Sequence, residues 1–119
     1  MKVRPFMFGA ALSVIAATAS AHAHLRASNP ADGSTISVRP SSIELEFSEA
    51  ARVTAAWVQR GDEPKRRLGP LSARASAKVT IPSPDLAPGH YAVSWRVIGQ
   101  DGHVTSGQIH FTIATASGK

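Results

Sequence analysis

Apolar and polar residues alternate along most of the chain beyond residue 24. The alternation is clearest over 91–98 and 108–113, and shorter stretches of it occur at 43–47, 52–59 and 78–81. A period of two residues is typical of strands with one buried face and one wet face, whereas an amphipathic helix needs apolar residues three and four positions apart. This region lacks the helical spacing, so we predict an all-β domain.

Turn residues between these segments indicate how the strands are connected. Weaker strands are expected at 25–28 and 67–71, which brings the number to about seven. Pro88 and Gly89 precede Tyr91, an arrangement that resembles the tyrosine corner of Greek-key sandwiches. We therefore predict a Greek-key β-sandwich. The two tryptophans alternate with polar neighbours and are expected in its core, namely Trp57 and Trp95.

The N-terminal segment has the three regions of a secretory signal peptide. Lys2 and Arg4 precede an apolar stretch over 5–17, and small residues follow. The apolar stretch is shorter than the roughly 20 residues that a membrane span needs. We expect residues 1–23 to be removed and residues 24–119 to form one exported domain without a membrane-inserted segment. An uncleaved N-terminal anchor is the alternative.

The charge of the predicted domain is modest. Removal of two basic residues leaves eleven basic and eight acidic residues, a formal charge of +3 against +5 for the whole chain. The basic residues are scattered apart from Lys65, Arg66 and Arg67, which follow turn residues and are expected to form a solvated turn. Nucleic-acid binding needs a basic stripe or interleaved aromatic residues. The sequence has neither, so no nucleic-acid partner is predicted.

Sulfur ligands are missing from the predicted domain. The chain has no cysteine, and both methionines, Met1 and Met7, belong to the predicted leader. Disulfides and thiolate metal sites are therefore excluded. A dedicated thioether site for Cu(I) is not expected either, because soft ligands are the ones that Cu(I) prefers.

Nitrogen and oxygen ligands remain. If His24 is the first residue after cleavage, its amine and its imidazole can chelate one metal ion. Asp101 and His103 flank Gly102 between the two clearest strands, and residues two apart in an extended segment project to the same side. An amine, two imidazoles and a carboxylate suit tetragonal Cu(II), although zinc also accepts such ligands. The other histidines of the domain have no partner at ligand spacing and are expected to be surface residues, namely His90 and His110.

The cleavage position affects this site. Two overlapping small-x-small signals allow cleavage after Ala21 or after Ala23. Both products begin with a histidine. A start at His22 would let the amine and His24 wrap Cu(II) together with amide nitrogens, without help from the rest of the chain.

These residues belong to a wider resemblance that covers essentially all of 24–119. The sequence resembles the CopC family of periplasmic copper-binding proteins in the segments 24–34 (HLRASNPADGS), 43–49 (IELEFSE), 86–91 (LAPGHY), 93–97 (VSWRV) and 101–103 (DGH), with Gly107. The resemblance implies a Greek-key sandwich or barrel, cupredoxin- or immunoglobulin-like, that binds one Cu(II) ion per chain. The ligands that it implies are His24, Asp101 and His103, with Glu49 close to the metal. It also favours His24 as the first residue.

The resemblance implies copper resistance, homeostasis or trafficking rather than catalysis, and its candidate partner is a CopD-like inner-membrane copper importer. One branch of the family adds a methionine-rich loop for Cu(I). Residues 24–119 contain no methionine, so we expect a binder of Cu(II) only, acting as a monomer.

Two other functions stay open. An N-terminal histidine and a second histidine also form the copper brace of oxidative polysaccharide-cleaving monooxygenases. Asp101 argues against that enzyme, because a carboxylate would occupy the coordination position that oxygen chemistry needs open. The other alternative is an interaction module that uses its sheet edges, with incidental histidines.

Overall fold

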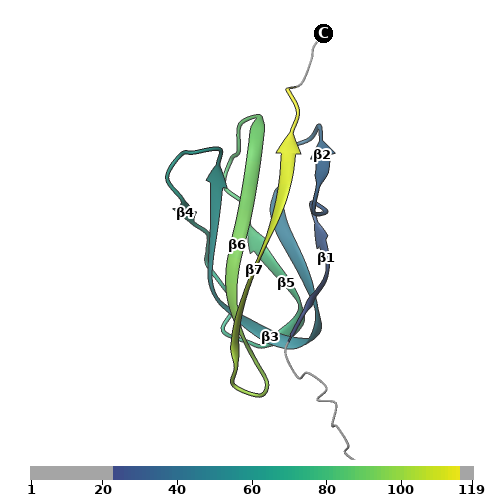
Figure 1. The fold of residues 1–119 in the computed structure, drawn as a ribbon, viewed down its shortest axis with the longest axis vertical. Coiled ribbons are helices and arrows are strands. Elements are labelled where there is room, and N and C mark those ends of the chain that lie inside the picture. Colours follow the sequence, from purple (N-terminus) through teal and green to yellow (C-terminus); the bar gives the residue numbers. More distant parts are fainter. Residues whose placement is uncertain (1–22, 116–119) are drawn as a thin grey trace, which may run out of the picture.

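Seven strands make up the part of the chain that the computed structural model describes, residues 23–115. In chain order they are β1 (Leu25–Asn29), β2 (Ser34–Ile36), β3 (Ser42–Arg60), β4 (Arg66–Arg67), β5 (Ser76–Pro82), β6 (Gly89–Gly99) and β7 (Val104–Ile113), as Figure 1 shows. The prediction of an all-β domain with about seven strands is confirmed. Residues 1–22, which hold nearly all of the predicted leader, lie outside the described part. Within that part, no helix is long and apolar enough to cross a membrane.

One long strand organises the sheet. The first half of β3 pairs with β1 and β5, and its second half pairs with β6 and β4. The hydrogen-bonded order β1-β3-β6-β7-β2 therefore turns a corner at β3, and the sheet curls until its two halves face each other (Figure 1). All pairs are antiparallel except β2 with β7, which is parallel.

The sequence predicts two separate strands at 43–47 and 52–59, and this division into two strands is wrong. The structure has one continuous strand of 19 residues. The intervening residues, Ser48 to Ala51, include neither glycine nor proline, so nothing ends the strand. The break appears instead as a register shift between Glu46 and Ala51 in the pairing with β5.

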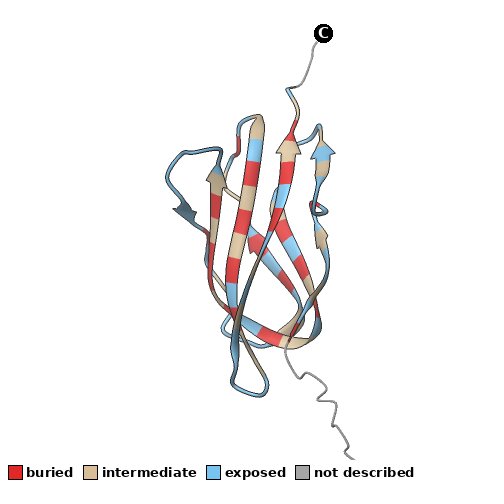
Figure 2. Cartoon of the chain, in the orientation of Figure 1, coloured by how far each residue is buried: buried red, intermediate tan, exposed pale blue. Residues whose placement is uncertain are grey.

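Apolar side chains of the alternating segments form the buried core between the two halves. Figure 2 shows the buried residues as bands that alternate with less buried ones along the strands. Tyr91 stacks on Phe111 with ring centroids 5.6 Å apart, and Phe47 meets Trp95 edge-on at 6.3 Å. The Tyr91 hydroxyl donates a hydrogen bond to the carbonyl of Ala87. The predicted tyrosine corner is therefore present, and the core position of Trp95 is confirmed.

Trp57 lies outside the core, contrary to the sequence prediction. The pairing of β3 with β6 shifts by one residue between Val53 and Ala55, which is a β-bulge. Ala55 and Ala56 are both buried, and Trp57 is then only half-buried, on the outer face. An extra residue in one strand inverts the facing of every later side chain, so simple alternation gives the wrong face beyond the bulge.

Candidate metal centre

Three segments that are far apart in the sequence meet at one end of the molecule. The start of β1, the bend of β3 and the turn between β6 and β7 lie there together (Figure 1). His24 directly precedes β1, Glu49 lies in the bend, and the pair Asp101 and His103 belongs to the turn. The four residues singled out from the sequence thus share one end of the sandwich.

The β6–β7 turn is tightly closed. The Gly99 amide donates to the carbonyl of His103 at 3.0 Å, and the Gly102 amide donates to the carbonyl of Gly99 at 3.0 Å. Gly102 has a φ of +83°, a conformation that residues with a Cβ rarely adopt. The glycine therefore permits the reversal that brings its two neighbours, Asp101 and His103, together.

Asp101 and His103 are in direct contact. The His103 amide donates to Asp101 Oδ1 at 3.0 Å, and His103 Nδ1 lies 2.8 Å from Asp101 Oδ2. The predicted convergence is present, but a turn produces it rather than an extended segment. An ionised carboxylate can only accept hydrogen bonds, so it holds the proton on Nδ1 and leaves the lone pair on Nε2. Carboxylates orient metal-binding histidines in this way.

His24 is held against the bend of β3. Its backbone nitrogen donates to Ser48 Oγ at 2.9 Å, and its carbonyl accepts from the Ser48 amide at 2.7 Å. Its side chain is exposed. Ser48 was not among the residues predicted from the sequence, because its contact with His24 depends on the pairing of Leu25 with Phe47, which no local pattern encodes.

Glu49 contributes an unusual oxygen. The residue is half-buried, and its Oε2 atom is buried without a hydrogen-bond partner among the described residues. A buried carboxylate oxygen without a donor is costly, and a cation is one way to compensate it. The bend therefore offers a buried acceptor at the same end of the molecule as the Asp101 and His103 pair.

The four residues do not yet form a ligand cage. Within residues 23–115, no three histidine or acidic side chains stand close enough together to hold a metal ion. Among the described residues, the structure thus joins Asp101 to His103 and places His24 and Glu49 at the same end of the sandwich.

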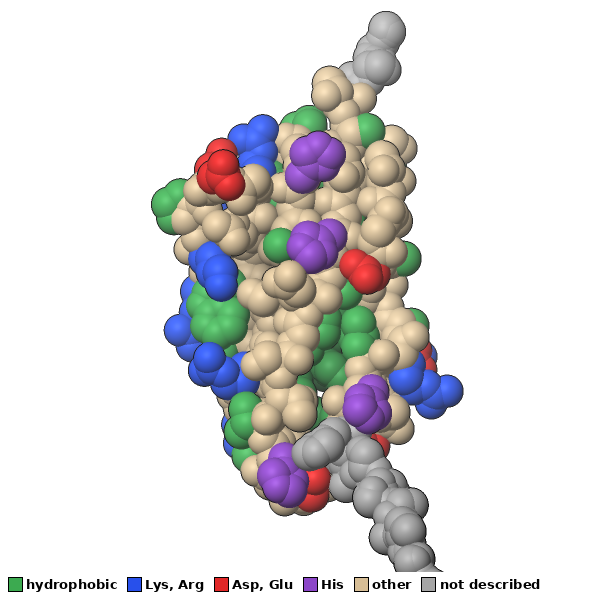
Figure 3. Space-filling view, in the orientation of Figure 1, with side chains coloured by type: hydrophobic (Ala, Val, Ile, Leu, Met, Phe, Trp, Pro, Cys, Tyr) green, Lys and Arg blue, Asp and Glu red, His purple; other side chains and the backbone are tan. Residues whose placement is uncertain are grey.

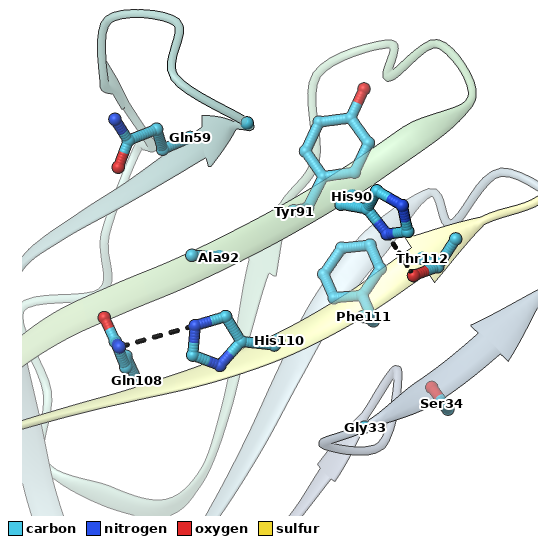
Figure 4. Close-up of a pocket in the computed structure, with 11 residues that line it drawn as sticks. Gly33, Ser34, Gln59, His90, Tyr91, Ala92, Gln108, His110, Phe111 and Thr112 are labelled. Atoms are coloured by element: carbon cyan, nitrogen blue, oxygen red, sulfur yellow. Dashed lines mark hydrogen bonds between the residues drawn. The ribbon is translucent and has the colours of Figure 1, made fainter.

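The other two histidines lie on the outer face of β6 and β7. They border an open groove of about 470 Å³ (Figure 4). His90 Nδ1 lies 2.8 Å from Thr112 Oγ1, and His110 Nε2 lies 3.5 Å from Gln108 Nε2. Both are exposed, so their predicted surface position is confirmed. Figure 3 shows histidine side chains toward both ends of this view of the molecule.

The family of the chain follows from a comparison with family models. The CopC domain model matches residues 25–114, which is most of the chain. The chain belongs to the CopC family. Its relatives include Copper resistance protein C of Xanthomonas campestris pv. juglandis, 33% identical over 113 residues, with 87% of this chain and 88% of that protein covered. Protein YobA of Escherichia coli strain K12 is 29% identical over 106 residues, covering 85% and 86%.

Solved structures of the CopC family have the same fold. CopC from Methylosinus trichosporium OB3b superposes with a TM-score of 0.71 at 20% identity, over 82% of this chain and 99% of that one. PcoC, described as a methionine-rich copper resistance protein from Escherichia coli, gives 0.59 at 29% identity, over 78% and 99%. The predicted Greek-key fold is thus confirmed. This member differs from PcoC in composition, since it has only two methionines, Met1 and Met7.

Proposed function

We propose that the chain is a periplasmic Cu(II)-binding protein that acts in copper resistance, homeostasis or trafficking. Its membership of the CopC family and the copper resistance proteins among its relatives support this role. The observation that carries the proposal is the contact between Asp101 and His103, at the end of the molecule where His24 also lies. Copper is here a cargo, and the protein is not an enzyme.

The proposed site holds one Cu(II) ion with three nitrogen atoms and one oxygen atom. The nitrogen donors are the amine and imidazole of His24, once cleavage has freed the amine, and Nε2 of His103. Asp101 supplies the oxygen. A carboxylate has about four lone-pair positions, so Asp101 can accept both hydrogen bonds from His103 and still coordinate a metal. This hard-to-borderline ligand set favours Cu(II) over Cu(I).

Ser48 and Glu49 support the ligands in this proposal. A metal-bound amine keeps two N–H groups, so the nitrogen of His24 can still donate to Ser48 Oγ, which orients it. Glu49 brings a negative charge close to the ion, and its unsatisfied Oε2 then faces a cation. In this proposal, His24 moves toward the turn when it joins Asp101 and His103 on the metal.

Electron paramagnetic resonance of the Cu(II)-loaded protein tests the ligands. His103→Ala should change the hyperfine pattern, because one nitrogen donor is lost. His90→Ala removes an exposed histidine far along β6 and serves as the matched control. A His103→Ala spectrum identical to that of the unaltered protein would sink the proposed site.

Intact mass of the exported protein tests the terminus. Cleavage after Ala23 would leave His24 first, and cleavage after Ala21 would leave the start His22-Ala23-His24. Ala23 is buried against the core with 7% exposure, so the second cleavage keeps that contact and the first removes it. A mass that corresponds to a chain beginning at His22 would contradict the proposed site and favour a local N-terminal chelate.

The candidate partner of the protein is a CopD-like inner-membrane copper importer. We also propose that the protein is a monomer.

A further inference from the structure

Three cationic side chains surround one tryptophan on the outer face of the sheet. Lys65 Nζ lies 5.8 Å from the ring centroid of Trp57, and the guanidinium carbons of Arg67 and Arg96 each lie 5.6 Å from it. The four residues, called the Trp57 patch below, come from β3, β4, β6 and the residue before β4. Figure 3 shows basic side chains gathered around a large hydrophobic side chain on one flank.

The sheet builds this patch by register. Trp57 pairs directly with Arg67 across β3 and β4, and with Ser94 across β3 and β6. The bulge in β3 turns the indole outward, where the cations can reach it. The segment 65–67, expected from the sequence to be only a solvated turn, is thus held in place by pairing and by cation–π contacts.

The positive charge of the patch is not balanced locally. Within residues 23–115, the arginine–carboxylate ion pairs are Arg39 with Asp85 and Arg60 with Glu63. Among the residues that the structure describes, no carboxylate forms an ion pair with Lys65, Arg67 or Arg96. Like charges gathered around one ring repel one another, and a bound anion would relieve this repulsion.

A hollow beside the ring adds neutral hydrogen-bond donors. It has a volume of about 360 Å³, and its lining includes Lys65, Arg96, Ser94, Ser106 and Gln108. Hydroxyl and amide donors beside two cations match the carboxylate group, which accepts several hydrogen bonds and pairs well with guanidinium. The patch can therefore bind individual carboxylate groups through hydrogen bonds and ion pairs, in addition to attracting negative charge at long range.

We propose that the Trp57 patch is a docking surface for an acidic segment of a partner protein. Side-chain carboxylates of that segment pair with Arg67 and Arg96, and one enters the hollow beside the indole. A membrane surface fits less well, because interfacial binding requires apolar side chains that insert. The exposed large hydrophobic residues of the described part are Val38 and Val104, neither in the patch, and the Trp57 ring is already covered by cations.

The patch is separate from the proposed copper ligands. Trp57 lies six residues along β3 from Ala51, which pairs with Gly99 beside the β6–β7 turn. At about 3.3 Å per residue this separation is about 20 Å. A partner docked on the patch would leave the turn accessible, so the inference does not depend on the copper site.

Titration with a synthetic glutamate decapeptide, followed by two-dimensional nuclear magnetic resonance at low salt, tests the proposal. The protein is purified from cells that express the full chain. Amide shifts should concentrate at residues 57, 65–67 and 94–96. Arg67→Gln with Arg96→Gln should weaken binding by about tenfold or more, since two charge-assisted contacts are lost.

A control variant that loses the same number of positive charges elsewhere distinguishes binding at the patch from a general effect of net charge. Arg74→Gln with Lys78→Gln removes two exposed positive charges from β5 and the loop before it, and should weaken binding by less than about twofold. Equal weakening in the two double variants would overturn the proposal. The single variant Lys65→Gln provides an independent check, with an expected loss of a few-fold, because it alters only one exposed side chain.

Binding to vesicles of anionic phosphatidylglycerol tests whether a lipid surface, rather than an acidic protein segment, occupies the patch. Binding to these vesicles that is lost in the Arg67 and Arg96 variant, without binding of the glutamate peptide, would overturn the proposal in favour of a lipid surface. Binding of the peptide with no measurable vesicle binding would support it.

Discussion

At the scale of single residues, the contact of Asp101 with His103 determines which ring nitrogen of His103 would coordinate a metal in the proposed site. The carboxylate accepts from the amide and from Nδ1 of His103. The ring proton then lies on Nδ1, so Nε2 carries the lone pair that could coordinate a metal, and the ring proton need not move when a cation binds. The residue pair is therefore organised before binding, which the tripeptide sequence alone does not reveal.

Asp101→Asn should lower the affinity for Cu(II) by about 10- to 100-fold. The amide NH₂ of asparagine donates to Nδ1, which moves the ring proton to Nε2 and removes the donor lone pair, and a ligand charge is lost as well. Competition titration against a chelator of known affinity measures the change.

Asp32→Asn is the matched control, because Asp32 also accepts from a backbone amide, that of His110, at 2.8 Å. It lies near β2, away from the β6–β7 turn, and should leave the affinity within about twofold. An Asp101→Asn protein that binds copper as tightly as this control would refute the role assigned to the carboxylate.

At the scale of elements, β6 and β7 are fitted to each other around one glycine. A Cβ added at Gly107 would lie 2.7 Å from a ring carbon of Trp95, whose side chain is buried at 4% exposure. The indole thus lies over the glycine of the neighbouring strand, and Gly107 is required by packing rather than by its backbone conformation.

Gly107→Ala should lower the free energy of unfolding by about 1–3 kcal/mol, as expected for overpacking of a rigid core. The gain from restricting the unfolded chain is smaller, about 0.4–1 kcal/mol, so the net effect is destabilising. Urea denaturation measures it. Ser106→Ala changes the exposed neighbour and should stay within about 0.5 kcal/mol; a Gly107→Ala protein as stable as Ser106→Ala would show that Trp95 can move aside.

Much of the fold could be predicted from strand periodicity, because each strand with a buried and a wet face carries its own signal. The errors arose where pairing overrides that signal. Strand β2 has only three residues, too few to show an alternating pattern. Strand β3 continues through its bend, where the sequence predicts two strands. The bulge in β3 turns Trp57 outward. In the site, the Asp101 and His103 pair is local and was predicted, whereas Ser48 reaches His24 only through the pairing of β1 with β3.

At the scale of the whole molecule, the proposed functions occupy different regions of one rigid sandwich. The proposed copper ligands lie at the end with the β6–β7 turn. Trp57 lies on a flank, about 20 Å along β3 from Ala51, which pairs with Gly99 beside that turn. A partner can therefore hold the protein by the flank while the metal end remains open for transfer. Loss of the patch should weaken docking without changing copper affinity, and loss of His103 should do the reverse.

Copper should stabilise the whole fold, and acid should abolish this effect. A ligand that binds only the folded protein adds about 2.7 kcal/mol at 100 times its dissociation constant, which for a domain of this size raises Tm on the order of 10 °C. Imidazoles ordinarily titrate near about pH 6.5, and α-amines near about 8. Because protons compete with Cu(II) for these nitrogens, the added stability is present at neutral pH and falls as the pH drops through that range.

Thermal unfolding with and without Cu(II), at pH 7.5 and at pH 5, measures both effects. The copper-dependent rise in Tm should be large at pH 7.5 and nearly absent at pH 5. His103→Ala should show little rise at either pH, while His90→Ala should behave as the unaltered protein. A copper-dependent rise of equal size at both pH values would contradict nitrogen ligation, because a site built from carboxylates alone would keep most of its affinity at pH 5.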